Sequence, residues 1–436
     1  MDLKHGEINN GKIRLHTLQT DRFKMSRFSI NFIIKSDKYL TPLCKLMLSV
    51  MMRGSEKYPT ITDINKALDE HYGTSVSFRQ KRVGDKAVFK LSCKLLNQKY
   101  VFSEDKTNIL EGVLEILSDI FMHPKKDGDG LLLSSYVESE KRIAIDAINA
   151  RINDPKSYAS EMCAKYMYEG SQFEIHGGDA GLIDSFTPAK LTENIQKFFD
   201  QAQVECYYIG DEPYERIASL IERYLPFDIG KNSGIKYGES AFEGNRTEPI
   251  LIEEEKDVSQ GRLVLGYRCG TVLSDGDYYA MVLFNEIFGG GSVSKLFMNV
   301  REKKSLCYYC YSSLHSATGT IFVGCGIDPS KKDNAIREIG TQLDAMKRGD
   351  FSDEEIETAR RTLISGIRQT YDSPSSIEAF MFRRLLSGVY EAPERSCENL
   401  LAVTREDVIR AAQKVVLDTV YFLKGNDDGV EDGEDE

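Results

Sequence analysis

The sequence contains no tryptophan and only six histidines among its 436 residues. The histidines are scattered along the chain, at His5, His16, His71, His123, His176 and His315. No two of them lie within ten positions of each other. A helix that binds zinc through two histidines needs them close together in sequence, on one helical face. The sequence therefore excludes a zinc helix built on a histidine pair, in either orientation of the motif.

Long apolar runs and an excess of basic residues are also missing. No segment approaches the roughly 20 apolar residues of a membrane-spanning helix, and the N-terminal stretch MDLKHGEINNGKIRLHTLQTDRFK is too polar for a secretory signal. The nine cysteines stand at irregular spacings, which in a large chain without a signal indicates reduced thiols. We therefore expect a cytoplasmic protein that binds neither membranes nor nucleic acids.

The net charge of −12 comes largely from the end of the sequence. Residues 427–436, DDGVEDGEDE, hold seven carboxylates and no cation, so the rest of the chain has a net charge of −5. Like charges in such a run repel one another, and we predict a disordered acidic tail. A solubilising role is the simpler interpretation, and an interaction tail is the alternative.

What the sequence does contain is an internal repeat. Residues 27–54, RFSINFIIKSDKYLTPLCKLMLSVMMRG, match residues 262–289, RLVLGYRCGTVLSDGDYYAMVLFNEIFG. Each segment has the pattern of an alternating strand, a polar turn and an apolar helix that ends in glycine. Further matching pairs follow in the same order, and the offset between partners falls steadily from 235 to 216 residues. Such an ordered series indicates duplication of one domain.

The repeat predicts the organisation of the whole chain. We expect two homologous domains, residues 1–225 and 249–426, joined by a linker at residues 226–248 that is rich in glycine, asparagine and serine. In each domain a capped helix, beginning after Thr187 or Thr404, precedes a closing strand. The fold class predicted is α+β, with a mostly antiparallel sheet covered by helices in each domain.

Two further stretches carry a resemblance to a known family. MMRGSEKYP follows the first apolar helix, and FGGGSVSKLFMNVREKKSLCYYCYSS lies in the second repeat. Together with the duplicated α+β plan, they resemble the pitrilysin/insulinase metallopeptidases over nearly the whole chain. The resemblance implies a processing-peptidase-like fold in which the chain forms one half of a clamshell around an internal chamber.

In active members of that family the first helix carries H-x-x-E-H, in which two histidines bind zinc and the glutamate is the general base. A third ligand, a glutamate, comes from a later helix. The matching positions in this sequence are Lys45, Leu48, Ser49 and Ala147. Lysine repels a cation, leucine cannot accept a proton, serine is a poor zinc ligand and alanine has no donor atom. Glu140 matches only a secondary carboxylate of the pattern, so we predict no catalytic residue and no metal in this chain.

The second repeat retains a different part of the family pattern. Arg301 and Tyr308 match a pair that holds substrate opposite the zinc, with arginine bonding peptide carbonyls and tyrosine stabilising the oxyanion. The resemblance implies a non-catalytic, substrate-binding subunit of a heterodimeric peptidase that grips an extended peptide. Its partner would be a homologous subunit that contains H-x-x-E-H and holds the zinc. The alternative is a peptide-binding or scaffold pseudoenzyme with no role in proteolysis, in which Arg301 and Tyr308 are ordinary surface residues.

Two short patterns admit other interpretations. FGGGSVSKLF lacks the hydroxyl residue that follows lysine in a phosphate-binding loop, because Leu296 follows Lys295. A helix that ends in a flexible turn explains it better. Cys307 and Cys310 have the C-x-x-C spacing of a redox pair. On the strand predicted there the two thiols would point to opposite faces, so we expect ordinary thiols, with a redox role as the alternative.

Overall fold

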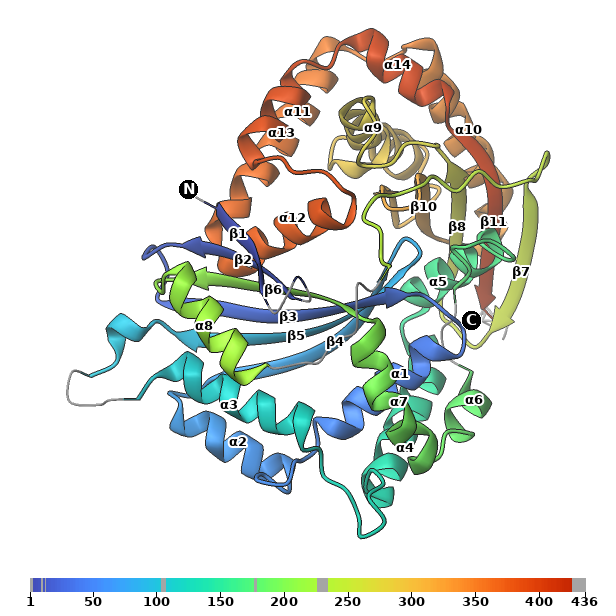
Figure 1. Cartoon of the computed structure of the whole chain (residues 1–436). Coiled ribbons are helices and arrows are strands. Elements are labelled where there is room, and N and C mark those ends of the chain that lie inside the picture. Colours follow the sequence, from blue (N-terminus) through green and yellow to red (C-terminus); the bar gives the residue numbers. More distant parts are fainter. Residues whose placement is uncertain are drawn as a thin grey trace, which may run out of the picture. The chain divides into compact units, whose positions relative to one another are not determined.

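Figure 1 shows the computed structural model of the chain, which describes residues 3–8, 11, 13–102, 107–175, 179–225 and 234–425. The predicted acidic tail and residues 226–233 of the predicted linker lie outside these ranges. The chain folds into two compact units. The first comprises residues 1–149, 176–237 and 371–383, and the second comprises residues 150–175, 238–370 and 384–436.

The first unit is built on a sheet whose six described strands have the order β1-β2-β6-β3-β5-β4. Neighbouring strands are antiparallel except for β2 and β6, which are parallel. The strands are β1 (Leu3–Ile8), β2 (Ile13–Gln19), β3 (Met25–Lys35), β4 (Ser75–Val83), β5 (Lys86–Leu96) and β6 (Gln203–Gly210). The helices are α1 (Leu40–Met51), α2 (Ile61–Glu70), α3 (Ile109–Met122), α4 (Ser134–Asn149), α6 (Ala180–Asp184), α7 (Pro188–Gln201) and α8 (Tyr214–Tyr224).

Strand β3 shows how the first unit divides its apolar and polar residues. Phe28, Ile30 and Phe32 are buried in an apolar core together with residues of α1, α3, α7 and α8. Because successive strand residues point to opposite faces, the intervening Arg27 and Ser29 lie on the other side of the sheet. In Figure 1, α3 and α8 lie on one side of this sheet and α12 (Pro374–Leu386) on the other.

The second unit has a sheet whose described strands follow the order β7-β11-β8-β10-β9. Only β7 and β11 are parallel neighbours. The strands are β7 (Ile250–Lys256), β8 (Gly261–Arg268), β9 (Tyr309–His315), β10 (Thr320–Ile327) and β11 (Val416–Gly425). The helices include α9 (Tyr278–Asn285), α10 (Lys332–Arg348), α11 (Asp353–Arg368), α13 (Pro393–Leu401), α14 (Arg405–Gln413) and the π-helices η3 (Glu286–Gly290) and η4 (Leu296–Lys303).

The two sheets confirm the predicted duplication and the predicted fold class. Without β1, the first sheet has the plan of the second, with one parallel pair followed by three antiparallel pairs. The matching capped helices are also present, because the Thr187 side chain accepts a hydrogen bond from the Lys190 N–H at the start of α7. The Thr404 side chain does the same with the Asp407 N–H at the start of α14, where a full capping box forms.

Each unit also contains one helix that comes from the other half of the sequence. Helix α5 (Pro155–Met167) belongs to the second unit, where it packs against β8 and β11. Residues 371–383, which form most of α12, belong to the first unit. The predicted boundaries at 225 and 249 therefore mark where the sequence repeats, whereas the compact units exchange this one helix. Among the described residues, no helix combines the length and the apolar composition needed to cross a bilayer.

Candidate functional site

Helix α1 carries three of the four positions where the family's zinc chemistry is expected. Leu48 is only 2% exposed and belongs to the apolar core of the first unit. Ser49 is half-buried, and Lys45 is exposed on the helix surface. At the position predicted for the general base the chain therefore has a packing residue, and at the position predicted for the first histidine it has an exposed lysine.

Helix α4, which supplies the fourth position, packs against α1. Ala147 lies exposed near its C-terminal end and has no group that could bind a metal. Glu140, the one matched carboxylate, forms an ion pair with Arg53, whose Nη1 lies 2.8 Å from its Oε1. The Arg53 guanidinium also lies over the Tyr136 ring, 5.4 Å from its centroid. This carboxylate is thus neutralised by a cation of the protein itself.

The residues at these positions do not fit a zinc ion. Zinc sites in proteins use nitrogen, sulfur and carboxylate donors, commonly four in a tetrahedral arrangement. Within the described ranges, no cluster of three or more histidine, cysteine or acidic side chains could hold a metal. Helices α1 and α4 pack against each other although the predicted positions carry no histidine or carboxylate.

The turn after α1, which carries residues of the family pattern, is held in place by close contacts. A Cβ atom at Gly54 would collide with the backbone of Pro59, so this close approach requires glycine. The Tyr136 hydroxyl donates a hydrogen bond of 2.7 Å to the Pro59 carbonyl and ties the turn to α4. Gly54 and Tyr136 therefore fix the turn after α1 against α4.

Arg301 lies near the end of η4 in the second unit. Its guanidinium is 4.6 Å from the centroid of the Phe297 ring, and its Nε is 3.4 Å from Glu302 Oε1. The side chain is 40% exposed, so the ion pair with Glu302 is weak and leaves donors facing solvent. An arginine in this setting can still bind a carbonyl or carboxylate oxygen.

Tyr308 stands directly before β9, which is the last strand of the second sheet. It is 66% exposed, and its backbone N–H donates a hydrogen bond of 2.8 Å to the Gly326 carbonyl. Its backbone is thus fixed against β10, and its ring projects into solvent. Arg301 lies in the last turn of η4 and Tyr308 at the end of the short connection from η4 to β9, so both predicted substrate-binding residues flank this connection.

Two thiols meet close to Tyr308 in the sheet, a contact that the sequence did not predict. Cys310 on β9 pairs in register with Cys325 on β10, and their Sγ atoms are 3.1 Å apart. Cys307 lies before β9 and is half-buried. The prediction that Cys307 lies on a strand is wrong, because β9 begins at Tyr309. Pairing of β9 with β10 was needed to bring in Cys325.

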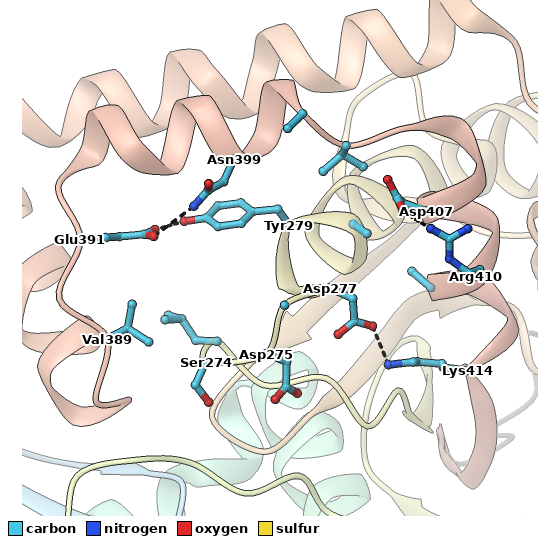
Figure 2. Close-up of a pocket in the computed structure, with 16 residues that line it drawn as sticks. Ser274, Asp275, Asp277, Tyr279, Val389, Glu391, Asn399, Asp407, Arg410 and Lys414 are labelled. Atoms are coloured by element: carbon cyan, nitrogen blue, oxygen red, sulfur yellow. Dashed lines mark hydrogen bonds and ion pairs between the residues drawn. The ribbon is translucent and has the colours of Figure 1, made fainter.

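A separate pocket of about 690 Å³ lies in the second unit, between α9, α13 and α14 (Figure 2). Two of its acids form ion pairs with lining bases, and one of these pairs is Asp277 with Lys414 at 2.5 Å. Arg410 bonds Asp407 and the Tyr279 hydroxyl bonds Glu391 across the same wall. None of the predicted site residues lines this pocket. The pocket is therefore separate from the site that the sequence predicted.

A family model described as the Peptidase M16 inactive domain matches residues 185–363. The probable inactive metalloprotease YmfF of Bacillus subtilis strain 168 is 32% identical over 426 residues, which is 96% of this chain and 97% of that protein. The uncharacterised zinc protease YmxG of the same strain is 22% identical over 69% of this chain and 72% of its own length.

Solved structures share the same architecture. The structure of a conserved protein from Enterococcus faecalis V583 matches with a TM-score of 0.87 and 25% identity, over 96% of this chain and 97% of that one. A peptidase M16 inactive domain from Pseudomonas fluorescens matches with a TM-score of 0.76 and 17% identity, over 98% of both chains. At that lower identity the likeness establishes the fold alone.

Proposed function

We propose, from the premise that this chain belongs to the M16 (pitrilysin/insulinase) metallopeptidase family as an inactive homologue, that it is the substrate-binding subunit of a two-chain zinc peptidase. The observation that carries the proposal is the contrast between its two functional regions. Leu48, at the predicted general-base position of α1, is part of the core, whereas the Arg301 side chain is 40% exposed and Tyr308 is 66% exposed beside β9.

The proposed role of these two residues is to hold and orient an extended peptide. Strand β9 ends the described order of the second sheet, so a peptide could add along it through backbone hydrogen bonds. Arg301 would donate to peptide carbonyls through its planar guanidinium. The Tyr308 hydroxyl would donate to the oxygen that gains negative charge during hydrolysis. The metal and the general base would come from a homologous H-x-x-E-H subunit.

The first experiment measures zinc content and peptide hydrolysis for the full chain alone and with an H-x-x-E-H homologue from the same cell. We expect no stoichiometric zinc and no hydrolysis for the chain alone, and activity only in the mixture. An isolated chain that binds one equivalent of zinc and cleaves peptides would overturn the proposal.

The second experiment tests the two residues in the assembled enzyme. Tyr308→Phe removes one oxyanion donor and should lower kcat about 100-fold. Arg301→Lys keeps the charge but loses the planar fork, and should mainly raise KM. Matched controls are Tyr390→Phe and Arg348→Lys, which change residues that are also exposed. Equal behaviour of site and control variants would exclude the substrate-binding role.

One observation favours a second candidate, a scaffold with no part in proteolysis. Arg301 already contacts Glu302 and Phe297 of its own helix, as an ordinary surface arginine does. This candidate predicts that a partner complex forms and functions fully with both Arg301→Lys and Tyr308→Phe. The kinetic comparison above therefore separates the two candidates.

A further inference from the structure

Only one residue separates the acidic tail, residues 427–436, from the end of β11. The register of the second sheet shows which residues lie at the same end of that sheet. Leu423 of β11 pairs with Arg262 of β8, and Arg262 pairs with Gly326 of β10. The Gly326 carbonyl in turn accepts the hydrogen bond from the Tyr308 N–H. The tail therefore follows β11 at the end of the sheet where Tyr308 stands.

The acidic tail is long enough to span the distance from β11 to Tyr308. Strands β11 and β9 are three strand spacings apart in the order β11-β8-β10-β9, which is about 14 Å at ~4.8 Å per spacing. An extended chain covers ~3.3–3.6 Å per residue, so a segment of this length can reach about 35 Å. The tail therefore exceeds the required distance roughly twofold.

Two consecutive lysines lie between the end of β11 and Tyr308. The Nζ atom of Lys332, at the start of α10, is 5.7 Å from the centroid of the Phe422 ring in β11. Lys331 donates a hydrogen bond of 3.1 Å from its Nζ to the Ser305 carbonyl, in the connection from η4 to β9. The two lysines therefore link the end of β11 to the connection that precedes Tyr308.

The surface in this region carries five cations, at the end of η4 and the start of α10. We call it the cationic surface, and it comprises Arg301, Lys303, Lys304, Lys331 and Lys332. Two of its lysines already have acidic partners, because Lys304 pairs with Glu338 and Lys332 pairs with Glu253. These pairs tie the end of η4 and strand β7 to α10. The charge that is left for a further anion therefore lies on the other three residues.

Those three cations are poorly compensated. Lys303 donates a hydrogen bond of 3.1 Å to an uncharged amide oxygen of η4, and Lys331 donates to a backbone carbonyl. Neither lysine forms an ion pair within the part of the chain that the structure describes. Asp328, the nearest acid before Lys331 in the sequence, accepts a hydrogen bond from a serine hydroxyl instead. The pair of Arg301 with Glu302 is 3.4 Å long and exposed.

We propose that the acidic tail binds the cationic surface of its own chain. The tail has seven carboxylates and no cation, and these carboxylates pair with Lys303, Lys331 and Arg301. A single exposed ion pair contributes little. A tethered segment, however, is present at an effective concentration on the order of 1 mM, so several weak pairs together are enough to hold it.

Binding of the tail has a consequence for the residues beneath it. Arg301 belongs to the cationic surface, and Tyr308 ends the connection that Lys331 contacts. A bound tail occupies both residues and competes with an incoming peptide. This consequence rests on the function proposed above. The binding of the tail does not, and it is tested in the isolated chain.

The test compares the full chain with a variant of equal length that carries Asp→Asn or Glu→Gln at all seven acidic positions of the tail. Both are acetylated with the N-hydroxysuccinimide ester of acetic acid at low salt, and mass spectrometry gives the rate at each lysine. Lys303 and Lys331 should react at least twofold faster in the variant, because the tail no longer shields them. Lys414, at the opposite end of β11, is the control and should react equally in both chains. Equal rates at Lys303 and Lys331 would overturn the proposal.

Two conditions distinguish the chain's own tail from other occupants. The shielding of the two lysines should disappear in about 0.5 M NaCl, where the Debye length falls to about 4 Å. It should be the same at about 1 µM and about 50 µM protein, because the binding is intramolecular. Shielding that is lost on dilution would assign the surface to the tail of a second copy and overturn the proposal. Shielding that survives the salt would exclude charge pairing and overturn it too.

The effect on peptide binding is measured separately, in the assembled enzyme. The amide variant of the tail should lower the KM for a peptide at least twofold and leave kcat unchanged, because a competitor of the peptide has been removed. An unchanged KM, together with shielding of Lys303 and Lys331 in the isolated chain, would confirm the binding of the tail and contradict the substrate-binding role of Arg301 and Tyr308. The two proposals therefore fail in different experiments.

Discussion

Helices α12 and α5 come from the same place in the two repeats, and each packs on a sheet, but by different chemistry. Both begin with proline, Pro374 and Pro155, and four positions later the first has Glu378 where the second has Ala159. Both residues have zero exposure. One buried site therefore contains a carboxylate in the first unit and a methyl group in the second.

In the first unit the surroundings of Glu378 are ionic. Its carboxylate accepts hydrogen bonds from Arg27 and Ser29 of β3 and forms an ion pair with Lys90 of β5. In the second unit the positions that match Ser29 and Lys90 in the repeat are Val264 and Phe322.

These apolar residues pack with Ala159 in one cluster beneath α5. The same helix position is thus held by a charge cluster in one unit and by apolar packing in the other. A buried ion pair rarely adds stability over well-packed apolar residues of similar volume. A buried ion pair instead raises the free energy of structures in which the helix lies elsewhere, because a buried charge without its partner is costly. We infer that the charges specify where α12 lies and that apolar packing suffices for α5.

The largest effect is expected when the charge is placed in the wrong unit. Ala159→Glu would bury a carboxylate against Val264 and Phe322, within an apolar cluster. The cost should be about 4 kcal/mol or more of unfolding free energy, from desolvation and overpacking. Urea unfolding followed by circular dichroism measures the loss. Lys165→Glu on the exposed side of α5 is the control and should cost less than about 0.5 kcal/mol. A cost near 1 kcal/mol for Ala159→Glu would mean that α5 is not tightly packed.

A smaller but still large effect should follow from removing the charge that belongs there. Glu378→Ala leaves Lys90 and Arg27 beside each other without their carboxylate, and both are about one-fifth exposed. Loss of one partner from a buried pair costs about 3 kcal/mol, and partial exposure places this case at the low end of the usual range. Hydrogen exchange of α12 peptides should rise in the same variant.

Copying the second unit provides the matching test. The triple variant Glu378→Ala, Lys90→Phe and Ser29→Val reproduces the residue types at Ala159, Phe322 and Val264. Its stability should recover most of the loss of the single variant, because apolar packing of similar volume replaces the ion pair. A triple variant that is less stable than Glu378→Ala would show that apolar residues cannot replace the ion pair beneath α12.

Because charged groups hold α12 on its sheet, the stability that they contribute should depend on pH. The apolar packing of α5 should show no such dependence. Burial raises the pKa of the Glu378 carboxyl, but Lys90, Arg27 and Ser29 outweigh it and hold the pKa below its usual value. A lowered folded-state pKa contributes stability above the unfolded pKa of about 4.3, and this contribution is lost as the pH falls through the folded value. The stability difference between the wild type and Glu378→Gln should therefore be constant from pH 7 to 5 and shrink below pH 4. A difference that stays constant down to pH 3 would show that Glu378 is not ionised in the folded chain.

The contrast between the two helices marks the limit of what the sequence predicts. The repeat units, the threonine caps and the predicted zinc positions are all patterns of residues that lie close together in the sequence. Such local patterns were enough to predict the fold class. The place where α12 packs could not be predicted in this way, because its residue Glu378 contacts Arg27, which lies 351 positions away in the sequence. Nothing in the local pattern of α12 identifies that partner. The contact between Cys310 and Cys325 was missed for the same reason, because only the register of β9 with β10 brings these two cysteines together.

The smallest effect is expected from removing a hydrogen bond that lies beside the apolar cluster beneath α5. Tyr158, one position before Ala159, donates a hydrogen bond from its hydroxyl to Glu254 at 3.0 Å, and Tyr421 bonds the same carboxylate. Its counterpart in α12 is Ile377, which is buried among Leu18 and Ile209. Tyr158→Phe keeps the ring and removes one hydrogen bond, so it should cost about 1 kcal/mol. Because Tyr421 still bonds Glu254, the carboxylate is not left without a donor, and urea unfolding should place the loss well below that of Glu378→Ala. A loss equal to that of Glu378→Ala would show that α5 also depends on a polar anchor, and the distinction between the two helices would disappear.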